Sequence, residues 1–447
     1  MHTHAVNIFR GSVAGALLAG LAAHPVQAAD VGSVDWSGVS TSKPRLFYPG
    51  QSSYEWLQIE EHKKASNEVK GGEACLKCHK GEQKSLGGIL VEEGRLEDMP
   101  IEEKSGYKRI TVQAAHDADT LYLKVSWESD GEREGNLGNF IRSDAGEWAF
   151  WGNHRQHEAV VDDGQPAIYP DRLGIMIGDK GVPLYPEHGC WMTCHDSMVG
   201  MADQADEDEV AEHDVIGQLY KKFGVKNVYV RKYLPGSRDD ATSWDTVKGE
   251  GDLAALRKQG AFLDLIIWDA ALTNPIDRAA DFNVLEIKKV DDGESPLLPN
   301  GKMIGGPEYM FDASKVGYAA LSEADLDDPA KAKHLILGVN TAPFDAGAIE
   351  DGGILPAHVL DPQGASGSAA DVHAKGSWED GTYTVLLQRK LDTGHPDDDI
   401  TLKAGGVYTF GFSIHDDAAG KRAHLVSFPV SVSIGPGEAD IQAATLQ

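Results

Sequence analysis

Segments in which apolar and polar residues alternate with a period of two dominate the chain after Tyr107. Such alternation is typical of strands with one buried face, and these segments are rich in Val, Ile, Tyr and Phe. They are residues 109–115, 121–127, 172–177, 262–268, 334–339, 383–388, 407–414 and 424–434. Because no regular helix separates successive strands, the pattern predicts a mainly β fold, an antiparallel β-sandwich or barrel.

The part of the chain before Tyr107 shows little alternation. One helix is predicted at residues 54–66, where Trp56, Ile59 and Lys63 follow near-helical spacing. A segment of this size buries little core alone. We therefore predict a small helical or irregular segment in front of the strand-rich region.

Long insertions near residues 196–257 and 289–333 interrupt the predicted strands. Insertions of this length are typical of functional loops or small subdomains. The predicted division is a leader at 1–28, an N-terminal segment at 29–104, a strand-rich domain at 105–436 and a C-terminal tail at 437–447.

The leader has the three parts of a secretory signal peptide. Arg10 precedes the apolar run 12–23, and the small residues Val26 and Ala28 occupy positions −3 and −1 of a cleavage site. The alternative, an N-terminal membrane anchor, is disfavoured because the run is shorter than the roughly 20 residues that span a bilayer. We expect cleavage near Ala28 and a mature periplasmic chain without a membrane span.

The chain is strongly acidic. Its 447 residues include 41 Lys and Arg against 70 Asp and Glu, which gives a formal net charge of −29. Nucleic acids and anionic membranes are bound by clustered basic residues, and this chain has no long basic run, so the composition argues against both as partners. It favours partners with a basic docking face.

The four cysteines are too few for a disulfide-stapled scaffold, and two of them form a specific motif. Cys75, Cys78 and His79 make up a Cys-x-x-Cys-His pentapeptide, the attachment signature of c-type haem. Two thiols at this spacing reach the two vinyl groups of one porphyrin edge, and the adjacent imidazole reaches the iron. A redox Cys-x-x-Cys pair and half a zinc site are the alternatives, but the second ligand pair of a zinc site is missing at the usual spacing.

A second, looser version of the motif lies further along. Cys190 and Cys194 are separated by three residues and followed by His195. A bulged loop of this length still reaches both vinyl groups, which predicts a second haem c, less specifically than the first motif. A disulfide between the two cysteines is the alternative.

Electron-transfer haems take a sixth ligand, usually His or Met. For the first motif we prefer His62, on the predicted helix, and rank Met99 second. For the second motif the candidates are His424, His415, His188, Met198 and Met201. The residue pattern alone does not distinguish among them.

Several later segments resemble the ethylbenzene-dehydrogenase-type haem-binding domain. They are residues 189–196, 263–268, 274–275, 376–393, 408–417 and 424–427. The domain occurs in the small haem subunits of ethylbenzene and dimethyl sulfide dehydrogenases and in exported multihaem cytochromes. The resemblance covers roughly residues 105–436, and the segment with His62 and the first motif is similar to the cytochrome members.

The resemblance implies a β-sandwich that holds haem at one end, in an electron-transfer protein. The dehydrogenase subunits bind haem b with a Met and a Lys, the latter in a late Lys-x-Val-Ser segment. Here that segment begins with His424. The departure implies a covalent haem with His195 and His424 as axial ligands.

These observations predict an exported dihaem cytochrome that carries electrons between redox proteins. Two imidazoles on one iron leave little room for a substrate, so we favour an electron carrier over an enzyme. The alternatives are a haem enzyme with an open iron site and an electron-transfer subunit of a molybdenum dehydrogenase or reductase complex.

Overall fold

The computed structural model describes residues 31–48, 62, 68, 74–93, 104–194, 234–239, 247–286, 288–301, 306–420 and 423–446. The predicted signal peptide, most of the predicted helix at 54–66 and most of the insertion at 196–257 lie outside these residues. Within the described part, no helix is both long and apolar enough to cross a membrane.

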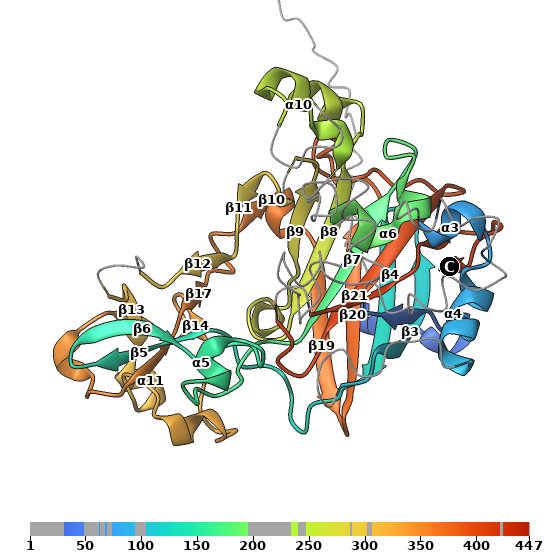
Figure 1. Cartoon of the computed structure of the whole chain (residues 1–447). Coiled ribbons are helices and arrows are strands. Elements are labelled where there is room, and N and C mark those ends of the chain that lie inside the picture. Colours follow the sequence, from blue (N-terminus) through green and yellow to red (C-terminus); the bar gives the residue numbers. More distant parts are fainter. Residues whose placement is uncertain are drawn as a thin grey trace, which may run out of the picture.

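A fourteen-stranded sheet forms the larger part of the molecule (Figure 1). Its main path runs through β10 (Lys288–Val290), β9 (Ala280–Val284), β8 (Leu263–Asp269), β7 (Arg172–Gly178), β21 (Val407–His415), β22 (Leu425–Ser427), β2 (Arg45–Phe47), β3 (Tyr107–His116), β4 (Thr120–Glu128), β20 (Thr382–Lys390) and β19 (His373–Glu379). Three further strands are β1 (Thr41–Ser42), which pairs with β3, β23 (Val430–Ile434), which pairs with β21, and β24 (Ile441–Thr445), which joins β23 to β3. The pairs along the main path are antiparallel, and β24 lies parallel to both its neighbours.

The two halves of this sheet, one containing β7 to β10 and the other β3, β4, β19 and β20, pack against each other across a common core. Trp268 of β8 contacts Trp127 of β4 and Tyr383 of β20, with ring centroids 6.1 and 5.7 Å apart. All three side chains are buried. The mainly β, antiparallel fold predicted from the alternation is thus confirmed.

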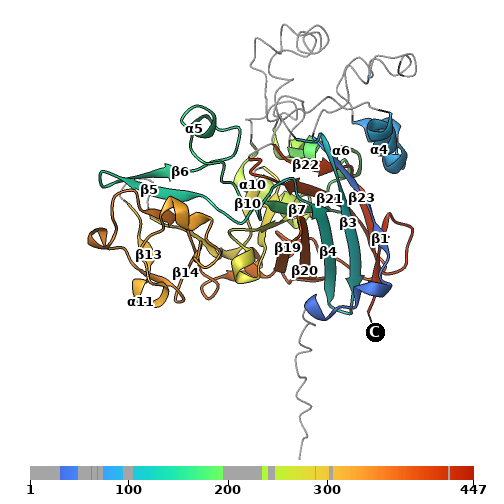
Figure 2. The same ribbon diagram turned by 90° about the horizontal axis from the view of Figure 1, so that it is seen from below.

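A smaller group of strands lies beside the main sheet and has a hydrophobic core of its own, which includes Phe140, Phe311 and Ile354 (Figure 2). Its strands are β5 (Phe140–Asp144), β6 (Glu147–Trp151), β11 (Gly293–Glu294), β12 (Leu297–Pro299), β13 (Tyr309–Phe311), β14 (Leu335–Ile336), β15 (Thr341–Pro343), β16 (Ile354–Pro356), β17 (His358–Leu360) and β18 (Ser366–Gly367). The described part of the predicted insertion at 289–333 belongs largely to this group.

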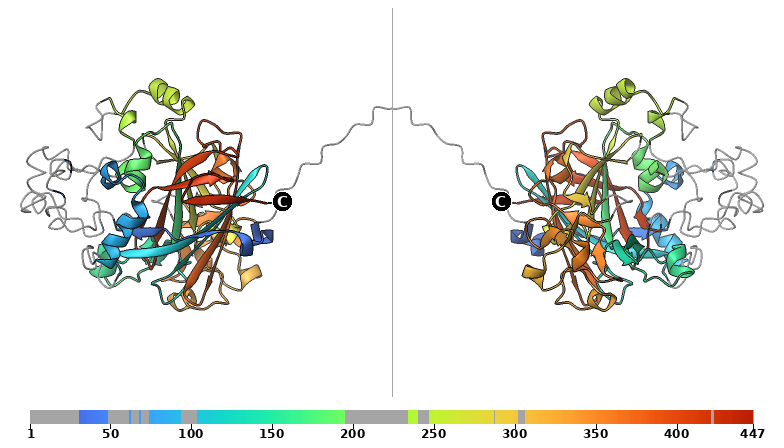
Figure 3. Two further views of the ribbon diagram at one scale, coloured as in Figure 1. Left: turned by 90° about the vertical axis from the view of Figure 1, so that its right-hand side faces the viewer. Right: turned by 90° about the vertical axis from the view of Figure 1, so that its left-hand side faces the viewer.

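Helices are few and short in the described chain. They are α3 (Cys75–Cys78), α4 (Gln83–Glu92), α5 (Glu158–Val161), α6 (Tyr185–Cys194), α10 (Glu250–Lys258) and α11 (Ala313–Val316). Two end-on views of the molecule place α3, α4 and α6 on the same side of the main sheet (Figure 3). Both predicted cysteine motifs therefore lie on that side.

The ends of the chain contribute strands to the main sheet. β1 and β2 come from the predicted N-terminal segment, and β24 comes from the predicted C-terminal tail. Arg45 of β2 also pairs with Glu92 at the end of α4, at 3.0 Å, and α4 packs over Phe47. The segment that carries the first cysteine motif is thereby anchored on the sheet. The boundaries at 104 and 436 stay predictions.

Candidate functional site

The first cysteine motif forms a single helical turn. Cys75 and Cys78 begin and end α3, and the His79 N–H donates to the Cys75 carbonyl at 3.0 Å. Leu76 between them is buried, whereas Cys75 and Cys78 are exposed residues with free thiols. Desolvation raises the pKa of the Cys75 thiol. The turn thus packs through Leu76 and leaves both cysteines free of a disulfide.

The His79 ring is oriented by a carboxylate. Its Nδ1 lies 2.9 Å from Oε2 of Glu82, three residues further along. In the tautomer that carries the proton on Nδ1, the ring donates this hydrogen bond and Nε2 is left with a lone pair for a metal. Metal-binding histidines usually have such a partner on the other ring nitrogen, which fixes the ring and raises its basicity.

His62, the preferred sixth ligand, lies opposite His79. The two ring centroids are 6.3 Å apart and the ring planes are at 84°. A metal–imidazole bond measures about 2.0–2.1 Å and a ring nitrogen lies about 1.1 Å from its centroid, so two imidazoles on opposite sides of one metal have centroids about 6 Å apart. The spacing of His62 and His79 therefore fits one iron between the rings.

The second cysteine motif begins at a kink in α6. Gly189 has a φ of +66°, a left-handed value that glycine adopts without strain, and it lies against Pro429. The Thr193 hydroxyl donates to the Gly189 carbonyl at 2.6 Å and closes the next turn. The kink turns the chain at the residue directly before Cys190, so that this side chain faces the sheet.

Cys190 is a free thiol buried against β21. Its Sγ lies 3.4 Å from the Tyr185 hydroxyl, and both contact the backbone at Gly411, where a Cβ atom would lie only 2.1 Å from the sulfur. Burial raises the pKa of the Cys190 thiol to about 11. In the folded chain the sulfur is therefore protonated at neutral pH and is a weak nucleophile.

His415 and His424 lie side by side near this helix. His415 ends β21, His424 directly precedes β22, and α6 packs on both strands. The two rings are stacked, with centroids 4.7 Å apart and planes at 25°. Stacked rings cannot occupy opposite sides of one metal, so at most one of the two is an axial ligand of a given iron in this arrangement.

A buried group of charges holds the turn that connects these histidines. The Lys108 ammonium lies 3.0 Å from Asp416 and 2.8 Å from Asp130, and that of Lys104 lies 3.2 Å from Asp417. Desolvation alone would lower the pKa of Lys108, but the facing carboxylates outweigh it and raise that pKa. Asp416 and Asp417, directly after His415, are thereby fixed to the rest of the domain.

The two cysteine motifs lie next to each other although more than a hundred residues separate them. Helices α3 and α6 are in contact, as their positions in Figure 1 also indicate. Groups attached to the two motifs would be close neighbours, which is the arrangement that electron transfer between them requires.

Not every predicted residue falls within the described chain. His195, Met99, Met198 and Met201 lie outside it, and of Cys194 only the backbone is described. His188 lies on α6, two residues before Cys190. The structure thus places His62 near His79, and it packs α6 on β22, the strand that follows His424. The roles of these residues as haem ligands stay predictions.

Sequence reasoning missed three contributors to the site: Glu82, Tyr185 and Gly411. An acidic residue three positions after His79 is the only signal for Glu82, and such spacing is common in any helix. The contacts of Tyr185 and Gly411 with Cys190 depend on the packing of α6 on β21, which no local pattern encodes.

The chain is similar to one protein family and to two cytochromes. The family model described as "Ethylbenzene dehydrogenase" matches residues 56–427. "Cytochrome c-552" of Stutzerimonas stutzeri is 25% identical over 411 residues, which cover 92% of this chain and 90% of that protein. "Cytochrome c-551" of Rhodocyclus tenuis is 27% identical over 170 residues, which cover 37% of this chain and 57% of that protein. The family match includes both cysteine motifs, His62 and His424.

Proposed function

Because the chain belongs to the ethylbenzene dehydrogenase family, we propose that it is an exported dihaem c-type cytochrome that carries electrons between redox proteins. The observation that carries this proposal is the pair His62 and His79, whose rings are 6.3 Å apart beside the free thiols of Cys75 and Cys78. Both similar proteins are named as cytochromes c, which supports the more general conclusion that this is a haem-containing electron-transfer protein.

At the first site each residue has a defined task. Cys75 and Cys78 would hold one haem covalently, and His79 and His62 would bind its iron. When bound, the haem supplies a one-electron couple. Glu82 keeps the His79 ring in place through its contact with Nδ1. With both imidazoles bound to the iron, the site would suit outer-sphere electron transfer.

At the second site Cys190 and Cys194 would hold the haem covalently, and His195 and His424 would bind its iron. Support comes from the position of Cys190 on α6, which packs on β22 next to His424. Because the buried Cys190 thiol has a pKa of about 11, attachment precedes the packing of α6 on β21. The contact of α3 with α6 supports direct electron transfer between the two haems.

The family name favours a second candidate, an electron-transfer subunit of a molybdenum dehydrogenase or reductase complex. The cytochrome of Stutzerimonas stutzeri, however, aligns over 90% of its own length, which favours a free-standing carrier. Purification from the native host distinguishes the two, since a subunit copurifies with a catalytic partner. A haem enzyme, the other alternative, would bind carbon monoxide rapidly in the reduced state because its iron has an open position.

The haem count is tested by intact-mass measurement of the purified protein together with its reduced absorption spectrum. We expect the mass of two covalent haems in the wild type. The double variants Cys75→Ser/Cys78→Ser and Cys190→Ser/Cys194→Ser each lose one. A wild-type mass with one haem or none would overturn the dihaem proposal.

The axial ligands are tested by electron paramagnetic resonance of the oxidised protein. His62→Ala and His424→Ala each convert one low-spin signal to high spin, and His373→Ala, at the exposed end of β19, changes neither. If His62→Ala leaves both signals unchanged, its assignment is wrong, and the same holds for His424→Ala.

A further inference from the structure

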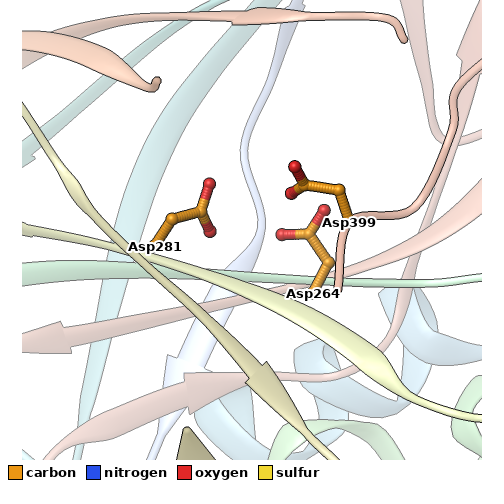
Figure 4. A group of neighbouring side chains, drawn as sticks. All are labelled: Asp264, Asp281 and Asp399. Atoms are coloured by element: carbon orange, nitrogen blue, oxygen red, sulfur yellow. The ribbon is translucent and has the colours of Figure 1, made fainter. Parts of the chain in front are cut away.

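The side chains of Asp264, Asp281 and Asp399 converge in the interior of the domain that the main sheet forms (Figure 4). One carboxylate oxygen from each lies within 4.8 Å of the other two. Asp264 and Asp281 have no exposed surface, and Asp399 is 2% exposed. We call these three residues the aspartate cluster.

Strand register brings two members of the cluster together. Asp264 on β8 pairs with Asn283 on β9, and Ile266, two residues further, pairs with Asp281. Residues two apart on a strand share a face, so Asp264 and Asp281 are diagonal neighbours on the same face. Asp399, from the loop between β20 and β21, reaches the same point from the opposite half of the sheet.

The cluster has too little positive charge. Arg389 is fully buried, and its Nη2 donates to Asp264 at 2.5 Å and to Asp399 at 3.1 Å. Asp281 has no such donor: its Oδ1 accepts only from the adjacent Phe282 N–H, at 3.0 Å, and its Oδ2 has no hydrogen-bond partner among the described residues. Three carboxylates and one guanidinium leave two negative charges uncompensated.

Buried carboxylates in this state are costly, because a charge removed from water needs a partner of opposite sign. Figure 4 shows the Asp281 carboxylate pointing toward the carboxylates of Asp264 and Asp399, and its Oδ2 is buried without a hydrogen-bond partner among the described residues.

We propose that the aspartate cluster binds one divalent cation of the calcium type. Carboxylate oxygens are hard ligands that select Ca²⁺, Mg²⁺ or Mn²⁺ over softer metals. One divalent ion neutralises the two uncompensated charges. Ca²⁺ fits a mixed set of strand and loop ligands better than Mg²⁺, which demands near-ideal octahedral geometry and gives up its water reluctantly.

The ion would join the two halves of the sheet, because β8 and β9 supply two ligands and the loop after β20 supplies the third. Strand pairing places Leu265 of β8 level with Met176 and with Gly411, on the face that carries Cys190. The adjacent Asp264 points to the opposite face, so the sheet separates the aspartate cluster from Cys190. The role of the ion is therefore structural, and it does not depend on the proposed function.

Calcium binding to the purified haem-loaded protein tests the proposal. The protein is freed of metal with EGTA, and thermal unfolding is followed with no addition, with 1 mM Ca²⁺ or with 1 mM Mg²⁺. Metal analysis after gel filtration in Ca²⁺ gives the stoichiometry. We expect one Ca²⁺ per chain, a rise in Tm of about 3 °C or more with Ca²⁺, and a smaller rise with Mg²⁺.

Two variants locate the ion. Asp281→Asn removes the uncompensated carboxylate, so it loses the response to Ca²⁺ and is no less stable than wild type in EGTA. Asp252→Asn, an exposed aspartate on α10, keeps the full response. If Asp281→Asn does not fold, Asp399→Asn replaces it.

The absence of bound metal and of a Ca²⁺-dependent Tm shift in wild type would overturn the proposal. An equal response to Mg²⁺ would overturn the assignment to calcium, and an unchanged response of the variant would overturn the location. The haem absorption spectrum serves as a separate readout, and we expect it to stay the same in every sample.

Discussion

The carboxylate of Glu82 lies 2.9 Å from Nδ1 of the His79 ring. A carboxylate acceptor strengthens the bond from imidazole to ferric iron more than to ferrous iron. Replacing it by the neutral amide in Glu82→Gln should therefore raise the midpoint potential of the first haem. Glu82 is 60% exposed, so we expect on the order of 30 mV, half of the ~59 mV that a tenfold change in relative affinity produces.

Spectroelectrochemical titration of the haem-loaded protein measures this shift. The control is Glu93→Gln, which removes an exposed carboxylate directly after α4 without touching His79. Equal potentials in the Glu82 variant and wild type would contradict the role assigned to this hydrogen bond.

Individual residues differ in how far the sequence predicts them. The spacing of Cys75, Cys78 and His79 is dictated by the geometry of one porphyrin edge, so the motif is readable without a structure. Asp264 is not, because a polar residue in an alternating strand predicts a solvent-facing side chain. Its burial depends on Arg389, 125 residues away, and such long-range charge pairing leaves no local pattern.

Among the elements, the predicted strands with strong alternation are present. Segments 121–127, 262–268, 383–388 and 407–414 correspond to β4, β8, β20 and β21. Segment 424–434 is divided into β22 and β23 around Pro429, because proline lacks the N–H that a strand interior needs. Segment 334–339 is reduced to β14, Leu335–Ile336, and the polar strand β9 was not predicted.

The packing of α6 on β21 depends on the missing side chain at Gly411. A Cβ atom there would lie 2.1 Å from the Cys190 sulfur and 2.7 Å from the Tyr185 hydroxyl. Gly411→Ala should displace α6, lower the free energy of unfolding by about 1–3 kcal/mol and reduce the fraction of chains with a second haem. Denaturant titration and intact-mass measurement report the two effects.

Gly251→Ala is the matched control for this change. Gly251 lies in α10 with nothing within 4 Å of the added Cβ, and alanine is favoured over glycine in a helix by about 1 kcal/mol. We expect no loss of stability or haem there. A Gly411→Ala protein with wild-type stability and haem content would show that α6 does not need this close approach.

At the scale of the whole molecule, the alternation predicts the fold class but not which strands pack against each other. The contacts of Trp268 with Trp127 and Tyr383, and of Arg389 with Asp264, connect strands far apart in the sequence. The same holds for the contact between α3 and α6. Local periodicity specifies which face of each strand is buried, whereas these pairings depend on the order of strands in space.

The net charge of −29 belongs to the whole molecule, and we expect it to steer the approach of charged redox partners. Attraction to a basic redox protein accelerates the encounter at low ionic strength, and salt screens it once the Debye length falls to about 8–10 Å. We expect the second-order rate constant of electron transfer to a basic cytochrome to fall roughly tenfold between 10 and 200 mM salt. Stopped-flow spectroscopy of the haem bands measures it.

Two comparisons separate steering from other effects of salt. An acidic acceptor of similar potential should react faster, not more slowly, as salt rises, because screening then removes repulsion. Glu93→Lys, directly after α4, should lower the low-salt rate with the basic partner, whereas Glu323→Lys in the smaller group of strands should not. Equal effects of the two substitutions would place the docking face elsewhere.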